Sequence, residues 1–319
     1  MRFRRIVLPI AMLVILAVGF RYQASTHQMD KQNFAGPNHL PESLFEAEQD
    51  LSQSILSRKK IRPMSVLLLG LDSRAGEPAR ADTIMLAVCD PEHAGVNVIQ
   101  IPRDTCVKIP GRGYTKINHA MTYGGPELMK RTVEEWLKNP VDHTVVVDFA
   151  GFRKLVDLLG GLPIHVEKNM DYDDPSDGTH IHLRKGEQVL NGKQALDYAR
   201  FRYDPEADTG RMRRQQQVLR VLIDKGMTID TFPKTFQILE ILGDHLKTSI
   251  PPGELWLLAK SYYRFNPSVL QTESIQGVNQ VAPEDGLWYF FVERDEQERL
   301  QKLLANWLHS GSTSRDEAP

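Results

Sequence analysis

Cysteine is scarce in this chain, which has 319 residues and only two cysteines, Cys89 and Cys106. Two cysteines are too few for a disulfide-rich scaffold or for a zinc site built from cysteines. Both residues lie near the ends of predicted strands. A disulfide between them is one interpretation, and two buried thiols is the interpretation that we favour.

An excess of charge of one sign is also missing, with 39 Lys and Arg residues against 41 Asp and Glu residues. A balanced chain creates no global field of the kind that attracts nucleic acid, so we expect no nucleic-acid partner. The GxGxxG, P-loop, HExxH and GxSxG motifs are all absent, as is any evident Ser-His-Asp or Cys-His pairing. Nothing therefore indicates a covalent enzyme intermediate.

Long hydrophobic runs are absent except at the N-terminus. Residues 1–5 read MRFRR, and residues 6–20 then run without a charge until Arg21. The run is about three residues short of the roughly 18 expected of a spanning helix, and a signal peptide has a similar pattern. Because residues 23–25 form a poor cleavage site, we favour an uncleaved signal-anchor over residues 1–21. The basic residues then stay in the cytoplasm, and the rest of a single-pass plasma-membrane protein lies outside.

The remaining chain is organised around alternating strands and helices. Residues 22–60 are polar with one amphipathic stretch and predict an extracytoplasmic stalk, residues 61–309 a catalytic domain, and residues 310–319 a disordered tail. Apolar runs predict strands at 65–69, 83–88, 96–101, 143–149, 162–166, 270–276 and 288–292. Helices are predicted at 126–138, 152–159 and over much of the chain after residue 192. This alternation indicates an α/β domain, with a mixed central sheet flanked by helices on both faces.

Charged residues follow or precede the first three predicted strands. If these strands form an antiparallel meander, one edge of the sheet carries the end of the first, the start of the second and the end of the third. The residues there are Asp72, Arg74, Asp82, Arg103 and Asp104. The plain alternative is that loops are simply charged. We favour a shared site because Asp72 and Asp82 adjoin apolar strands.

A second group of arginines lies within residues 199–217, which read ARFRYDPEADTGRMRRQQQ. In an extended segment Arg200 and Arg202 point the same way, with Phe201 opposite. Residues 208–210 then predict a helix entry, with Asp or Thr as the cap.

The predicted helix brings further polar side chains to the same end. Arg211, Arg214 and Gln215 fall on one face at the three- and four-residue spacings. A helix N-terminus already favours an anion, and guanidinium groups pair with phosphate through two hydrogen bonds. A solvated basic helix is the plain alternative, but the first charged group makes a phosphate site the better interpretation.

Two aspartates among arginines also suit a magnesium ion. Mg²⁺ commonly takes one or two carboxylates, here Asp72 and Asp82, together with substrate phosphates. The residues therefore predict a Mg²⁺-assisted phosphoryl transfer on a pyrophosphate, with arginines stabilising the charge of the leaving phosphate.

Many segments of the chain resemble the LytR-CpsA-Psr (LCP) family. They are GLDSR, RADTIMLAV, IPRDT, IPGRGYTKINHAMTYGG, VDHTVVVDFAGF, LVDLLGG, LNGKQALDYARFR and DTGRMRRQQQ, in the family's order, between about residues 64 and 222. The resemblance implies an extracytoplasmic phosphotransferase that moves a glycopolymer, such as teichoic acid or capsular polysaccharide, from undecaprenyl pyrophosphate to peptidoglycan. It also implies a hydrophobic cavity for the prenyl chain, and we expect wall-synthesis proteins as further partners.

The resemblance also assigns residues. It places the family's metal-associated acids at Asp72 and Asp82. It places the residues that act on or bind the substrate at Arg103, Lys116, Arg200, Arg202, Asp208, Arg211 and Gln215, where Lys116, Asp208 and Gln215 are promoted by the resemblance alone. Arg74, in the same motif as Asp72, and Arg214, from the helical spacing, join them as secondary binding residues. A prenyl-pyrophosphate pyrophosphatase and a non-catalytic lipid-phosphate binder stay open as alternatives.

Overall fold

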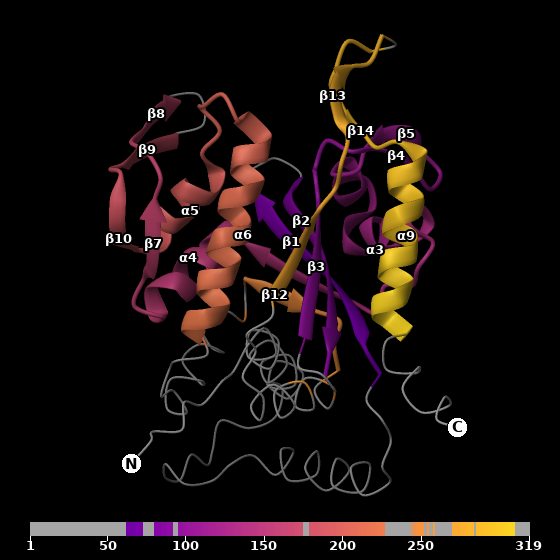
Figure 1. The fold of residues 1–319 in the computed structure, drawn as a ribbon, viewed down its shortest axis with the longest axis horizontal. Helices are drawn as coiled ribbons and strands as arrows, with labels where there is room; N and C mark the ends of the chain where they lie inside the picture. The colour runs from indigo at the N-terminus through magenta and orange to yellow at the C-terminus, as the bar shows by residue number, and fades with distance from the viewer. Residues whose placement is uncertain are drawn as a thin grey trace, which may run out of the picture.

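The computed structural model describes residues 62–72, 80–91, 95–174, 179–226, 245–251, 270–283 and 285–309, with Gly243, Glu254 and Leu258. Its centre is a six-stranded mixed sheet of order β11-β6-β1-β2-β3-β12 (Figure 1). The strands are β1 (Met64–Asp72), β2 (Arg80–Asp90), β3 (Gly95–Ile101), β6 (His143–Asp148), β11 (Leu246–Thr248) and β12 (Leu270–Ser274). β1, β2 and β3 form the predicted antiparallel meander, whereas β6 is parallel to β1 and β12 is parallel to β3.

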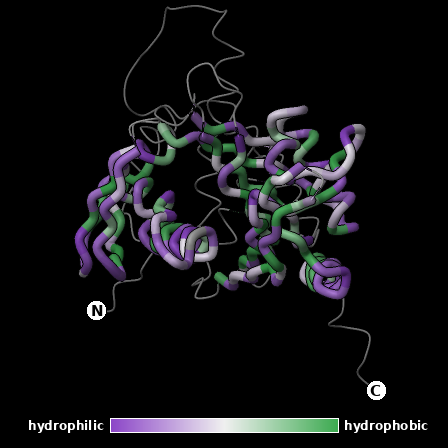
Figure 2. Tube along the Cα trace, turned by 90° about the horizontal axis from the view of Figure 1, so that it is seen from above, coloured by the Kyte–Doolittle hydropathy of each residue, from purple (hydrophilic) through white to green (hydrophobic). Residues whose placement is uncertain are grey.

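Helices cover both faces of this sheet, as predicted (Figure 1). On one face lie α4 (Phe149–Leu158), α5 (Gly192–Arg200) and α6 (Ala207–Gly226), and on the other α3 (His119–Leu137) and α9 (Arg294–His309). Alternate residues of β1 serve the two sides, so Val66 packs with the first layer and Leu67 with the second. A strand covered on both faces reads as a continuous apolar run, which is why the sequence SVLLL predicted it. Figure 2 shows hydrophobic residues concentrated along the central strands.

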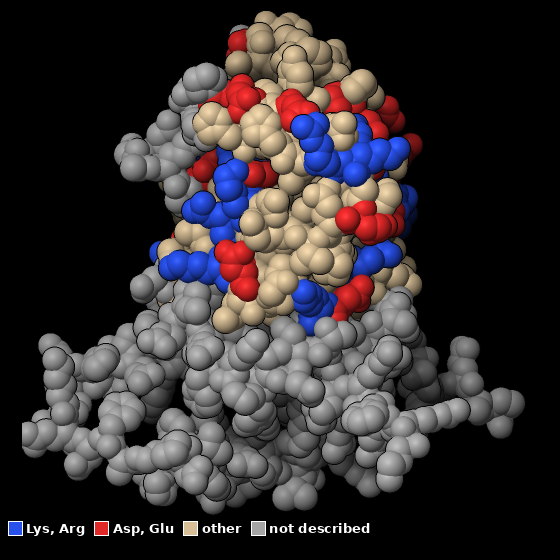
Figure 3. Space-filling view, turned by 90° about the vertical axis from the view of Figure 1, so that its left-hand side faces the viewer, with Lys and Arg blue, Asp and Glu red and all other residues tan. Residues whose placement is uncertain are grey.

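Four two-stranded sheets lie outside the central sheet in the described part of the chain. They pair β4 (Cys106–Ile109) with β5 (Gly113–Lys116), β7 (Leu162–Val166) with β10 (Gly186–Leu190), β8 (Met170–Asp174) with β9 (Thr179–Leu183), and β13 (Val278–Val281) with β14 (Trp288–Phe291). Only β7 and β14 were predicted, because the other strands are short and carry polar residues at alternate positions. On the side of the molecule shown in Figure 3, basic and acidic residues are interspersed.

Some boundaries differ from the sequence-based expectation. The helix predicted from residue 126 begins at His119, and its turn is broken at Gly124 and Gly125 before Pro126. Gly125 has a φ of 65°, which favours glycine.

Cys89 and Cys106 form no disulfide, and Cys106 is half-buried, not buried as expected.

The predicted anchor, stalk and C-terminal tail lie outside the described residues. Within the described part of the chain, no helix is both long and apolar enough to cross a membrane.

Candidate active site at the edge of the sheet

A β-bulge shapes the edge of the sheet where the charged residues gather. Asp72 pairs with Arg80 and Leu71 with Ala81, but the register then shifts and Gly70 pairs with Thr83. Asp82 is therefore the extra residue of β2. Bulges of this kind re-aim a side chain and are common beside active sites. The backbones approach closely here, since a Cβ on Gly70 would lie 3.0 Å from that of Thr83.

Arg103, just beyond the end of β3, forms the first group of ion pairs. Its guanidinium is hydrogen-bonded to Asp82, and its Nε lies 3.6 Å from Asp104, which Lys116 also approaches to 3.0 Å. Burial lowers the pKa of Arg103, but the charges of Asp82 and Asp104 outweigh burial and raise it overall. For Asp104, burial is outweighed by the hydrogen bond from Lys116 and the charge of Arg103, so its pKa is lowered. Both groups are thus held in their charged forms.

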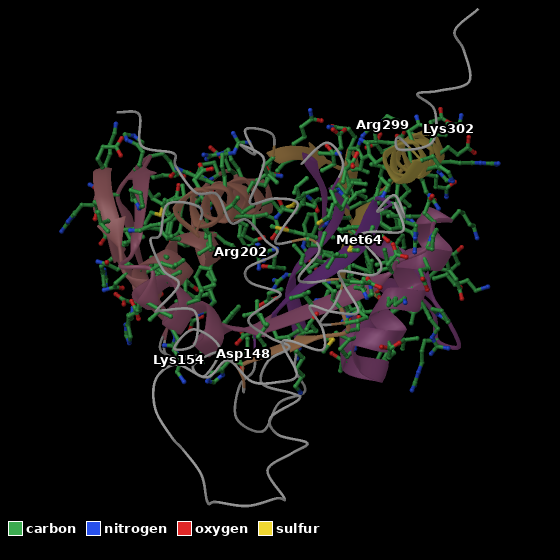
Figure 4. All side chains as sticks on the ribbon, turned by 90° about the horizontal axis from the view of Figure 1, so that it is seen from below. Met64, Asp148, Lys154, Arg202, Arg299 and Lys302 are labelled. Carbon is green, nitrogen blue, oxygen red and sulfur yellow. The ribbon has the colours of Figure 1, made fainter. Side chains whose placement is uncertain are left out.

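The first turn of α6 forms the second group. Asp208 lies 2.9 Å from Arg211 and 3.2 Å from Arg202, which enters from the segment between α5 and α6. Figure 4 shows Arg202 between α6 and the central strands. Burial, opposed by Asp208 and reinforced by Arg103 and Arg202, lowers the pKa of Arg211 to about 10. Arg211 therefore remains a cation at neutral pH.

These two groups are close enough to act on each other electrostatically. The charges of Arg103, Arg202 and Asp82 all act on Arg211, and Asp208 acts on Arg103. We refer to the following set as the charged cluster: Asp82, Arg103, Asp104, Lys116, Arg202, Asp208 and Arg211. Within it the Nε atoms of Arg103 and Arg211 are buried and donate no hydrogen bond inside the described part of the chain. Unused guanidinium donors beside fixed cations suit an anion with several oxygens.

Arg200 reaches this edge of the sheet from the end of α5. Its guanidinium lies 3.9 Å from Asp72 and 5.1 Å from the ring centre of Phe149. The prediction that Arg200 lies in an extended segment was wrong. The side chain of Asn191 caps α5 through a reciprocal capping box with Gln194, and the helix continues to Arg200.

Gln215 and Arg214 leave α6 in different directions. Gln215 is hydrogen-bonded to Gln100 on β3 at 2.8 Å. The side chain of Arg214 is fully buried and contacts Asp204 and Glu167, both at 3.0 Å. The structure therefore does not bring Arg214 into the charged cluster, and its contacts are those of a residue that anchors α6.

Two further expectations concern Asp208 and Arg74. α6 begins at Ala207, so Asp208 lies in its first turn and is not the cap, as had been expected. Arg74 lies outside the described residues.

Backbone hydrogen bonds fix the turn that carries Arg103. Its carbonyl accepts from the amide of Asn118 at 3.2 Å, and the carbonyl of Asp104 accepts from the amide of Phe290 at 2.9 Å. Tyr289, the neighbour of Phe290 on β14, places its ring centre 5.6 Å from Nζ of Lys116. The sequence predicted a strand over residues 288–292 but not its contact with the charged cluster. The high aromatic content of this strand was the one available signal.

The described residues contain no group of three or more His, Cys, Asp or Glu side chains arranged to hold a metal ion. Asp72 and Asp82 alone are compatible with Mg²⁺, which commonly takes one or two carboxylates and completes its shell with substrate phosphate and water. The donor set thus fits a metal that arrives with a phosphate ligand.

Known proteins resemble this chain over most of its length. The LytR_cpsA_psr family pattern matches residues 23–306. The polyisoprenyl-teichoic acid–peptidoglycan teichoic acid transferase TagU of Bacillus cereus is 35% identical over 252 residues, which cover 77% of this chain and 80% of that protein. The crystal structure of Bacillus subtilis TagV matches with a TM-score of 0.67 and 32% identity, covering 78% of this chain and 98% of that one.

A third relative was solved with a ligand. The LytR-CPS2A-psr family protein YwtF (TagT) with bound octaprenyl pyrophosphate matches with a TM-score of 0.60 and 28% identity, covering 78% of this chain and 91% of that one. The fold and these likenesses place the chain among the LCP proteins. The chain belongs to the LytR_cpsA_psr family.

Proposed function

We propose that this protein is an extracytoplasmic phosphotransferase that moves a glycopolymer from a polyprenyl-pyrophosphate carrier to peptidoglycan. The observation that carries the proposal is the charged cluster, in which three arginines from separate segments meet carboxylates at one edge of the sheet. Relatives that are teichoic acid transferases, and one solved with octaprenyl pyrophosphate, support the substrate class. The predicted signal-anchor would hold the catalytic domain on the outer side of the plasma membrane.

The prenyl chain would lie between the sheet and α6. Along β1, three successive positions on one face (Leu68, Gly70 and Asp72) are only half-buried, although the strand is central. Leu219 of α6 and Val147 of β6 are half-buried and pack against the same layer. These apolar residues lead to Asp72, so a lipid chain lying along them would bring its pyrophosphate to the charged edge.

The arginines would bind the pyrophosphate and neutralise its charge. Arg103 and Arg211 are already desolvated and held by carboxylates, so they need little reorganisation when the phosphate enters. Arg200 and Arg202 are more exposed and would complete the binding site. A hydroxyl of a peptidoglycan sugar would attack the phosphorus nearer the transferred glycan, forming one P–O bond. The P–O bond to the bridging oxygen would break, and prenyl phosphate would leave.

Magnesium is part of the proposal. Asp72 and Asp82 would hold the ion, and when bound it would offset negative charge on the phosphate oxygens. The proton of the attacking hydroxyl would pass to a carboxylate at this edge, for which Asp72 and Asp82 are both candidates.

An in vitro transfer assay tests the function. The protein is incubated with a synthetic prenyl-pyrophosphoryl glycan and peptidoglycan oligomers, in Mg²⁺ and in a chelator. We expect a phosphodiester-linked glycan on peptidoglycan that is formed in Mg²⁺ and lost in the chelator. Equal yields in Mg²⁺ and in the chelator would contradict the requirement for a metal ion but not the transferase activity.

Two other outcomes would replace the proposal. Release of glycan phosphate irrespective of acceptor would favour a pyrophosphatase, which uses water in the same site. Tight binding without turnover would favour a lipid-phosphate binding protein.

A further inference from the structure

The hairpin formed by β13 and β14 projects from the rest of the molecule (Figure 1). Four of its apolar side chains are exposed: Val278 by 51%, Val281 by 39%, Leu287 by 48% and Trp288 by 63%. A two-stranded hairpin has little stability of its own, and exposed apolar patches commonly mark a binding surface. The exposed Trp288 is the most informative member, because tryptophan offers a large rigid ring for contact.

The inner end of this hairpin is joined to the charged cluster. The amide of Phe290 donates to the carbonyl of Asp104, and Thr105 forms a β-bridge with Phe290. The neighbouring residue Tyr289 is buried and lies over Lys116. A molecule on the outer end of the hairpin would therefore be held at a fixed position relative to Arg103, which directly precedes Asp104.

One face of the hairpin combines an anchored side chain with exposed ones. Paired residues share a face, so Trp288 and Val281 lie on the same side as Asn279 and Phe290. Phe290 is held against Gly277, where a Cβ would lie 2.6 Å from the ring. Phe290 is thus anchored, while the same face presents the indole of Trp288, the aliphatic side chain of Val281 and the amide of Asn279 to solvent. This mixture suits an N-acetylated sugar, whose C–H face contacts a ring and whose polar groups bond to an amide.

Charge argues against other ligands of the hairpin. Residues 275–292 contain no Lys or Arg, and the only charged residues are Glu284 and Asp285. Anionic lipid surfaces attract clusters of Lys and Arg, and phosphates are bound by the same residues. An acidic hairpin without cations is therefore unsuited to the membrane surface and to the phosphates of the donor.

We propose that the β13–β14 hairpin is the platform on which the acceptor glycan of peptidoglycan docks, with Trp288 stacking against one of its sugar rings. This inference rests on the proposed function, because it assigns the second substrate of the same site. Docking on the hairpin places a sugar hydroxyl beside the charged cluster while the lipid-linked donor occupies the cluster itself.

The experiment compares Trp288→Ala, Trp288→Phe and the control Val189→Ala in the full-length protein. Val189 on β10 is 64% exposed and distant in the fold from the hairpin. The probe is an uncrosslinked oligosaccharide of alternating N-acetylglucosamine and N-acetylmuramic acid. Its binding is measured without donor by saturation-transfer NMR. Its KM in the transfer reaction is measured at saturating donor, and the KM of the donor is measured separately.

We expect Trp288→Ala to weaken oligosaccharide binding and raise the acceptor KM about fivefold or more, as for loss of one aromatic contact. The donor KM and the rate at saturating acceptor should stay unchanged, Trp288→Phe should recover most of the affinity, and Val189→Ala should match the wild type. An unchanged acceptor KM, or a rise in the donor KM alone, would overturn the platform and assign the hairpin to the donor or to a lipid surface.

The same experiment separates this inference from the proposed function. Oligosaccharide binding that depends on Trp288, without any transfer, would contradict the transferase and leave the platform standing. Transfer whose acceptor KM does not depend on Trp288 would contradict the platform and leave the transferase standing. Absence of oligosaccharide binding by the wild type would refute the platform directly.

Discussion

Replacing Arg214 by methionine should strongly destabilise the fold. The Arg214 side chain is fully buried and donates to Asp204, to Glu167 and, at 2.6 Å, to the carbonyl of Phe201. The side chain of Asp204 is only 3% exposed, so methionine would remove one basic partner of a buried carboxylate that Lys168 also contacts at 2.9 Å. Removing one member of a buried ion pair costs about 3–5 kcal/mol. That is a large share of the roughly 5–15 kcal/mol that stabilises a typical domain.

The neighbouring Arg213 provides a matched control. Its side chain is 49% exposed and pairs with Glu167 and Glu206 near the surface. Exposed pairs of this kind contribute less than about 1 kcal/mol, so Arg213→Met should be nearly neutral. Urea unfolding of the chain from about residue 40 onward gives both free energies from the midpoint and slope. Equal losses in the two variants would refute the view that burial of Asp204 makes Arg214 critical.

The pH dependence supplies a second check on Arg214. Burial raises the pKa of Asp204, but Lys168 and Arg214 outweigh burial and lower it overall. A lowered pKa stabilises the fold above the unfolded value of about 4, and this contribution is lost as the pH falls through the folded value. The gap between wild type and Arg214→Met should therefore be widest near neutral pH and shrink in acid. A gap that stays constant would show that the lost charge pair is not its cause.

Three further outcomes are expected. Asn191→Ala should cost about 1 kcal/mol in urea unfolding, because it removes the cap that accepts from the amide of Gln194; a change under half that size would show that the capping box contributes little. Arg103→Gln should lower the transfer rate about a hundredfold or more while far-ultraviolet circular dichroism stays unchanged, and a near-normal rate would remove Arg103 from the phosphate site. Arg200→Ala and Arg202→Ala should each reduce transfer without unfolding the domain, and near-normal transfer by both would contradict their role in binding the pyrophosphate.

Five of the six strands of the central sheet could be predicted from the sequence, but only the β1-β2-β3 part of their order in the sheet, and β11 was missed. β1, β2 and β3 are covered on both faces, so their apolar runs are long, and short connections made antiparallel pairing the natural expectation. That meander alone predicts that Asp72, Asp82 and Arg103 lie at one edge of the sheet. The hairpins β4–β5 and β8–β9 were missed because strands of four or five residues with polar alternate positions have no distinctive pattern.

The charged cluster was predictable in membership but not in detail. Helical spacing placed Arg211, Arg214 and Gln215 on one face, but neighbouring rows of a helix can serve different partners. Asp204 and Glu167 are separated from Arg214 by 10 and 47 residues in sequence, so no local pattern could show that they bury it. The role of Asp72 and Asp82 in holding Mg²⁺ stays a prediction.

The turn after β3 holds both Arg103 and the base of the projecting hairpin. Its backbone carbonyls accept hydrogen bonds from Asn118 and Phe290, so main-chain atoms fix both the position of Arg103 and the base of the projecting hairpin. Side chains at the outer end of the hairpin take no part in those bonds. Under the proposed docking of the acceptor on the hairpin, Trp288 and its neighbours could be changed to alter acceptor preference without moving Arg103 and the rest of the charged cluster.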